Sequence, residues 1–209
     1  MELINQSWKW VQLPDMPLEL IELAGRTCYK SEELIGAESS RRFAKMLIKC
    51  GHESVIDHAS ASVRFVTNRG VTHELVRHRL CAFSQESTRY VNYRSESMQF
   101  IKPVWWVDQW EGLTPLDVNR HAHSRFIESL EYAEESYNDL IEYGWRPEQA
   151  REVLPNALKT EIVVTANLRE WRHIFRLRTS KAAHPQIREL MRSCLAGFQS
   201  AVPVIFDDI

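Results

Sequence analysis

The stretch from Ala59 to Phe65 reads A-S-A-S-V-R-F, with apolar and polar side chains in strict alternation. This is the period of a strand that buries one face and exposes the other. Residues 159–166 form a second β-prone run, because they include Ile162-Val163-Val164-Thr165. Met98 and Phe100 repeat the alternation over a shorter stretch. These segments predict a small sheet.

Helical periodicity dominates the rest of the chain. Apolar residues recur at spacings of three and four from Leu116 to Tyr143, which predicts one long amphipathic helix ending at Gly144. Further helices are predicted after Pro17, from about Ser40 to Gly51, from Val71 to near Arg79, after Pro147, from an Asn167 cap through Phe175, and after Pro185, while residues 83–93 are predicted to be extended. We therefore predict an α+β fold in a single domain spanning residues 1–209, with a small, mostly antiparallel sheet and several flanking helices.

Composition excludes several classes of protein. The formal net charge is -2 and the pI is about 6.5, so no global field attracts nucleic acid. The cysteines form no C-x-x-C pair and are expected to be reduced thiols; they are Cys28, Cys50, Cys81 and Cys194. No apolar run approaches the roughly 18 residues of a membrane span, and no leader pattern is present. We expect a cytoplasmic protein that binds neither membrane nor nucleic acid.

Two segments are superficially similar to zinc protease motifs. One reads H-E-L-V-R-H from His73 to His78, and the other places His58 after His52-Glu53. A metal-binding H-E-x-x-H helix has its histidines four apart, whereas a spacing of five turns them about 140° away from each other. The sequence therefore predicts no metal site.

Arginines gather in one short part of the chain. Arg77-His78-Arg79 is followed, after seven residues, by Ser87-Thr88-Arg89-Tyr90, and no glycine-rich phosphate loop is present. Burying such a cluster without an anionic partner is costly, and the planar guanidinium suits phosphate oxygens. A solvated basic turn explains the same residues equally well. A second set follows later, at Arg151, Arg169, Arg172, Arg176 and Arg178.

Arg77-His78-Arg79, seven residues and Ser87 resemble the R-H-R-x7-S signature of the flavin-dependent thymidylate synthases. Two more blocks agree with that family: Gly51-His52-Glu53-Ser54 with Asp57-His58 upstream, and Arg151, Asn167-Leu168-Arg169 and Leu177-Arg178 downstream. The resemblance covers about residues 16 to 200. It implies an enzyme that methylates dUMP to dTMP, using noncovalent FAD, NADPH as reductant and 5,10-methylenetetrahydrofolate as the one-carbon donor.

The resemblance also assigns roles to individual residues. The flavin contacts would be His52, Ser54, Arg77, His78, Arg79, Gln85, Asn167, Arg169 and His173. The dUMP contacts would be Glu74, Leu75, Val76, Arg77, Gln85, Glu86, Ser87, Thr88, Arg89, Arg151 and Arg178. Arg178 would be catalytic, because a fixed positive charge beside the uracil stabilises the anion formed when N3 loses its proton. Cys81 is expected to be a packing residue and Ser87 a binding residue, not nucleophiles.

The family's active sites lie between subunits of a homotetramer, and the same assembly is expected here. Gln85 stands where many members carry glutamate, and Ser84 where many carry asparagine. A different interpretation stays open: a non-catalytic module could bind a nucleotide or RNA through the cluster from Arg77 to Arg89.

Overall fold

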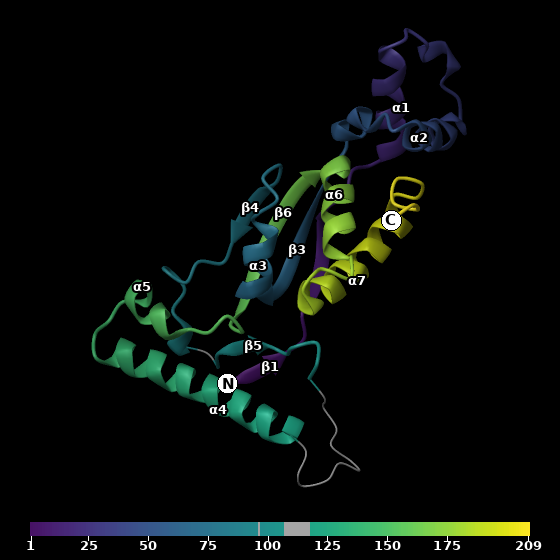
Figure 1. Ribbon diagram of the computed structural model, residues 1–209. Helices are drawn as coiled ribbons and strands as arrows, with labels where there is room; N and C mark the ends of the chain where they lie inside the picture. The colour runs from purple at the N-terminus through teal and green to yellow at the C-terminus, as the bar shows by residue number, and fades with distance from the viewer. Residues whose placement is uncertain (96, 107–117) are drawn as a thin grey trace. The chain divides into compact units, whose positions relative to one another are not determined.

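The computed structural model describes residues 1–95, 97–106 and 118–209. Its strands are β1 (Glu2–Ile4), β2 (Ser7–Gln12), β3 (Ser60–Asn68), β4 (Ala82–Gln85), β5 (Gln99–Ile101) and β6 (Lys159–Asn167). Its α-helices are α1 (Pro17–Thr27), α2 (Ser39–Cys50), α3 (Arg69–Leu75), α4 (Val118–Glu142), α5 (Pro147–Ala150), α6 (Leu168–Arg178) and α7 (Pro185–Ala201) (Figure 1). Short 3-10 turns are η1 (Glu32–Leu34), η2 (Glu53–His58), η3 (Tyr93–Ser95) and η4 (Arg151–Val153).

Two small sheets confirm the predicted α+β class. One has four strands in the order β2-β3-β6-β4, and the other pairs β1 with β5 in parallel. Strands β3 and β6 run antiparallel: Leu168 N–H donates to Ala59 O at 2.8 Å, while farther along β3 the hydroxyls of Ser62 and Thr165 lie 2.8 Å apart. Residue numbers therefore rise along β3 while those of its partners fall along β6, as in an antiparallel pair.

Several predicted elements differ from the observed ones. The helix after Asn68 ends at Leu75 and not near Arg79, because a turn bonds His78 N–H back to Leu75 O and carries the imidazole into the interior. Residues 83–93 are not extended throughout: β4 ends at Gln85, and a turn then places the N–H of Tyr90 on Ser87 O. Strands β1 and β2 were not predicted. Residues 116–117 of the predicted long helix lie outside the described residues, and the rest of that helix is confirmed by α4.

The chain divides into two compact units, and the single domain over residues 1–209 stays a prediction. The first unit contains residues 1–7, 66–74 and 85–162, and the second contains residues 8–65, 75–84 and 163–209. In the first, α4 packs on α5, η3 and η4 around a core of Met98, Phe100, Leu130, Tyr137, Ala150 and Leu158. No described helix is long and apolar enough to span a membrane.

The second unit has an aromatic core beneath α6 and α7, which lie side by side (Figure 1). Its buried rings are Phe65, Trp171, Phe175, Phe198 and Phe206. The 3-10 turn η2 packs on the same helix α6 and on α1. This core fixes one face of α6, so the residues on its other face and at its ends have defined positions.

Candidate functional site

Helix α6 organises the site of the second unit. Asn167 caps its first turn, with Oδ1 accepting from the backbone N–H of Glu170 at 2.8 Å, as predicted. Trp171, Ile174 and Phe175 are buried in the core. The opposite side and the two ends of the helix are therefore left for polar side chains.

A cavity of about 680 Å³ opens at the start of α6. Its lining residues are Glu53, Asp57, Leu80, Asn167, Arg169, Glu170, His173 and Arg176. Three of them, Asn167, Arg169 and His173, are predicted flavin contacts. The volume lies within the range of small-molecule and cofactor sites, and the positive end of the helix dipole faces an anion placed there.

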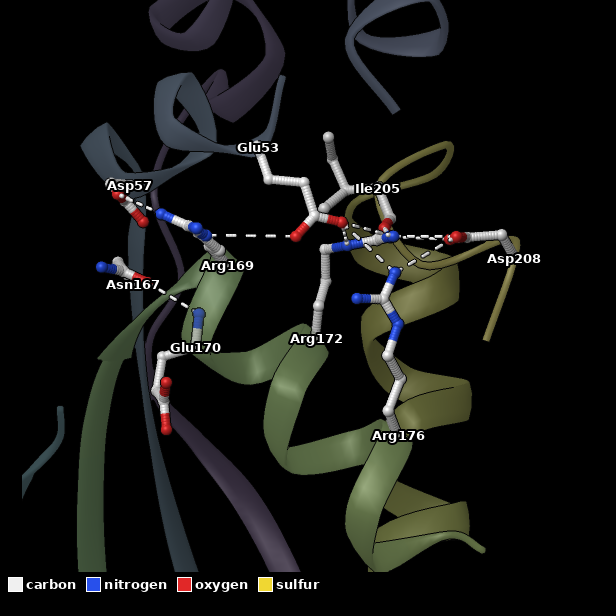
Figure 2. A network of polar contacts seen from close by, with 9 residues as sticks. All are labelled: Glu53, Asp57, Asn167, Arg169, Glu170, Arg172, Arg176, Ile205 and Asp208. Atoms are coloured by element: carbon white, nitrogen blue, oxygen red, sulfur yellow. Dashed lines mark hydrogen bonds and ion pairs between the residues drawn. The ribbon is translucent and has the colours of Figure 1, made fainter. Parts of the chain in front are cut away.

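An ion network borders this cavity. Figure 2 shows Glu53 between Arg169 on one side and Arg172 and Arg176 on the other. Arg169 also bonds Asp57 at 3.3 Å. The side chain of Arg172 is only 1% exposed. Burial works against its charge, but hydrogen bonds to Asp208 and Glu53 outweigh that cost and raise the pKa of Arg172.

The far end of α6 carries Arg178. Its Nε donates to Nε2 of His78 at 3.0 Å. On the other side of the imidazole, Nδ1 lies 3.6 Å from Oε1 of Glu170. Burial first, and then the charges of Arg178 and His173, lower the pKa of His78 to about 4, so the ring is neutral at neutral pH.

His78, Glu170 and His173 together offer atoms that could hold a metal ion. Each presents one ligand atom, and these atoms lie within 4.8 Å of one another. Spacing along the sequence does not reveal this set, because Glu170 and His173 lie in α6, far from His78 in the chain. While Nε2 of His78 accepts the N–H of Arg178, the proton of the neutral ring is on Nδ1, so the ring offers a metal no lone pair unless this hydrogen bond is broken.

The other predicted flavin contacts of the second unit lie at its surface. Arg77 and Arg79 are exposed on either side of the buried His78. His52 and Ser54, at the start of η2, are exposed too. The basic turn is therefore exposed at its two arginines and anchored by its buried histidine. This arrangement fits both interpretations of the cluster, a solvated turn and an anion-binding one.

The predicted dUMP contacts fall in both units. Residues 85–89, Glu74 and Arg151 belong to the first, whereas Leu75, Val76, Arg77 and Arg178 belong to the second. Leu75 is buried in the core, whereas Val76 is exposed.

The first unit brings two distant parts of the predicted phosphate site together. Nη1 of Arg151 lies 3.5 Å from the hydroxyl of Thr88, which is buried. Arg89 is exposed and lies over the ring of Tyr90, and its backbone N–H donates to the Ser87 hydroxyl at 3.3 Å. Arg151 and the Ser87–Arg89 turn therefore form one cationic surface of the kind that binds phosphate.

Gln85 and Glu86 hold that turn to the sheet through their side chains. The amide of Gln85 donates to the buried hydroxyls of Thr72 and Thr160, at 3.0 and 3.2 Å. Glu86 accepts from the Tyr93 hydroxyl at 2.8 Å and from Lys159 at 3.0 Å, beside a cavity of about 260 Å³. In this structure the Gln85 amide is thus a hydrogen-bond donor to α3 and β6.

Cys81 has the properties of a packing residue. Burial first, and then the charge of Glu170, raise its pKa to about 12, so it is a thiol at neutral pH. A thiol is a poor nucleophile, which agrees with the sequence prediction.

The sequence assigned no role to Glu53, Glu170 or Asp208. Glu170 had a signal, because it stands three residues after the Asn167 cap, where a capping-box acid occurs. Nothing in the sequence pairs Glu53 or Asp208 with Arg172.

Comparison with known proteins places this geometry in context. A family model described as thymidylate synthase complementing protein matches residues 10–204. A flavin-dependent thymidylate synthase of Mycobacteroides abscessus is 37% identical over 202 residues, which cover 90% of this chain and 78% of the relative. One of Corynebacterium aurimucosum is 35% identical over 198 residues, covering 90% of this chain and 78% of the relative. One of Geobacter sulfurreducens is 33% identical over 202 residues, covering 93% and 82%.

A solved structure supports the fold. The UMP/dUMP methylase PolB from Streptomyces cacaoi, bound with 5-Br dUMP, aligns with a TM-score of 0.82 at 24% identity. The alignment covers 99% of this chain and 96% of that one. At this identity the similarity establishes a shared fold.

Proposed function

Because the chain belongs to the flavin-dependent thymidylate synthase family, we propose that it methylates dUMP to dTMP, with 5,10-methylenetetrahydrofolate as the carbon donor and NADPH as the reductant. The observation that carries the proposal is the cavity at the start of α6, which gathers Asn167, Arg169 and His173 from the predicted flavin set.

The residues of this cavity fit FAD in size and in chemistry. Arg169, Arg176 and the positive end of α6 suit a diphosphate, and His173 offers a ring for stacking or hydrogen bonding. Glu53 and Asp57 already pair with Arg169, so a diphosphate competes with them for that guanidinium. The proposal takes the flavin to be bound noncovalently. When bound, FAD supplies the electron transfer between the nicotinamide and the one-carbon unit.

The chain's own residues bind and polarise the nucleotide. Arg89, Arg151 and Ser87 hold the phosphate. Arg178 faces the uracil, where its charge stabilises the ring anion and makes carbon-5 more nucleophilic. Carbon-5 then forms its new bond to the methylene carbon as that carbon's bond to the folate nitrogen breaks, and the proton on carbon-5 leaves. The two electrons supplied by NADPH reduce the transferred carbon to the methyl group, and tetrahydrofolate is released. No cysteine is required, in agreement with the raised pKa of Cys81.

We further propose a homotetramer in which Arg178 of one chain serves the Ser87–Arg89 turn of another. The family resemblance supports this arrangement. In a symmetric pair, each partner gives the same residues to the other's site, so the number of sites equals the number of chains.

Tritium release from [5-³H]dUMP tests the activity, because the methyl group replaces the hydrogen on carbon-5. The purified protein should be yellow, release free FAD on denaturation, and liberate tritium only when methylenetetrahydrofolate and NADPH are both present. Matched reactions that lack one component are the controls. A flavin-loaded protein that releases no tritium, or one that binds RNA and no flavin, contradicts the proposal.

A further inference from the structure

His78 and Arg178 are joined at the end of α6, inside the second unit. Arg178 donates through Nε, the single N–H on the stem side of its guanidinium, to Nε2 of His78 at 3.0 Å. His78 is 5% exposed, and its backbone N–H closes the preceding turn by donating to Leu75 O. The acceptor is therefore rigid and buried. A hydrogen bond to it from Nε restricts the rotation of the Arg178 guanidinium plane.

The acceptor role fixes the tautomer of His78. If Nε2 accepts, the proton of the neutral ring is on Nδ1. Nδ1 lies 3.6 Å from Oε1 of Glu170, which is too long for a hydrogen bond but places a carboxylate opposite the N–H. Glu170 is itself set by the Asn167 cap and is 7% exposed. The helix thus holds Glu170 on one side of the ring and Arg178 on the other.

We infer that His78 is a positioning residue for Arg178 and that Glu170 selects the tautomer that allows it. This inference rests on the proposed function, in which Arg178 faces the uracil. The bond through Nε sets the direction in which the terminal nitrogens of the guanidinium point. Neutral His78 is required, because an imidazolium has no acceptor nitrogen and would repel the arginine.

His78 is also a predicted flavin contact, so its variants are compared only after flavin occupancy has been measured by visible absorbance. His78→Leu removes the acceptor. His78→Gln keeps one, because the glutamine carbonyl reaches about as far as Nε2. With flavin bound, His78→Leu should lower kcat roughly 100-fold with little change in the KM for dUMP. His78→Gln should recover to within about tenfold of the native kcat.

Combining the substitutions separates positioning from general stability. If His78 acts through Arg178, then adding His78→Leu to Arg178→Ala should change the residual rate less than about threefold, because the bond is already absent. A second full 100-fold loss in the double variant would overturn the inference. So would a native kcat in flavin-loaded His78→Leu.

A readout without turnover tests the placement itself. In ¹⁵N NMR of the protein without dUMP, the Nε–H signal of Arg178, assigned by its loss in Arg178→Lys, should move in His78→Leu and largely return in His78→Gln. An unmoved signal overturns the placement whatever the activity. If the native protein releases no tritium, the proposed function fails and the catalytic part of the inference fails with it, whereas native activity with an unmoved signal defeats the inference alone. Zn²⁺ binding through His78, Glu170 and His173 that is required for activity would also overturn it.

Discussion

Both carboxylate oxygens of Asp208 accept hydrogen bonds from the buried guanidinium of Arg172, at 2.6 and 2.8 Å. The pairing lowers the pKa of Asp208, first through the hydrogen bond from Arg172. Arg172 also donates to the carbonyl of Ile205 and to Glu53 (Figure 2). One side chain of α6 thereby ties the loop after α7 to the turn η2.

Arg172→Met should lower the free energy of unfolding by about 3 kcal/mol, because it leaves two carboxylates and a carbonyl without their shared donor. Arg172→Lys should lose part of this stability and also weaken FAD binding, since His52 and Ser54 lie at the start of η2. Urea unfolding and flavin titration measure the two effects. Arg125→Ala is the matched control: Arg125 is highly exposed in its pair with Glu128, and its loss should change stability by less than about 1 kcal/mol. An Arg172→Met protein as stable as this control would contradict the role of the network.

Gly197 in α7 faces the ring of Trp8, and a Cβ at Gly197 would lie 2.6 Å from Cζ2 of Trp8. Trp8 is held by its hydrogen bond to Ser193 and by its edge contact with Trp10. Gly197→Ala should therefore cost about 1–3 kcal/mol of stability despite alanine's better helix propensity. Thermal unfolding measures this cost. Gly36→Ala has open space and is the control. Adding Trp8→Leu to Gly197→Ala should remove most of this loss of stability. If the loss remains in the double variant, contact with Trp8 is not its cause.

The low pKa of His78 makes stability depend on pH. Its folded pKa is about 4 and its unfolded value is 6.5, so the unfolded chain binds the extra proton between these values. Stability is therefore complete above about pH 6.5 and falls as the pH falls toward 4. Between about pH 7 and pH 5 the native protein should lose roughly 2 kcal/mol more than His78→Gln does. Burial raises the pKa of Glu170, which makes stability fall as the pH rises. The native protein and His78→Gln both keep Glu170, so this contribution is common to the two. Urea midpoints that fall equally in the two proteins would show that other groups control the slope.

Cys81→Ala should keep dTMP formation within about tenfold of the native rate, because a thiol with a pKa of about 12 does not ionise at neutral pH. Ser87→Ala should likewise retain measurable activity. Arg178→Ala should lose at least about 100-fold, because it removes the charge assigned to the uracil anion. If Cys81→Ala folds, binds dUMP and is fully inactive, covalent catalysis is reinstated.

Co-expression tests whether sites are shared between chains. Arg89→Ala and Arg178→Ala should each be inactive alone. If one chain supplies Arg89 and another supplies Arg178, random mixing should restore about a quarter of the sites by symmetry. Activity is measured on hybrids isolated with two different affinity tags, and mixtures of each variant with itself give the baseline. Verified hybrids with only baseline activity would place both arginines on the same chain.

The sequence by itself determined the fold class and the family. The alternation from Ala59 to Phe65 and the β-branched run before Asn167 became β3 and β6, because period and side-chain shape act over neighbouring residues. The Asn167 cap and the end of α4 before Gly144 are local for the same reason. The R-H-R-x7-S signature was likewise readable without coordinates.

Only the tertiary structure decided how individual charges are used. From sequence, Arg77, His78 and Arg79 form one basic run, but folding buries the histidine and leaves both arginines exposed. Arg172 resembled its neighbours Arg169 and Arg176, yet it alone among the three is buried, against Glu53 and Asp208. These partners come from positions far apart in the chain. Their pairing depends on the packing of α6 against η2 and α7, which no local pattern encodes.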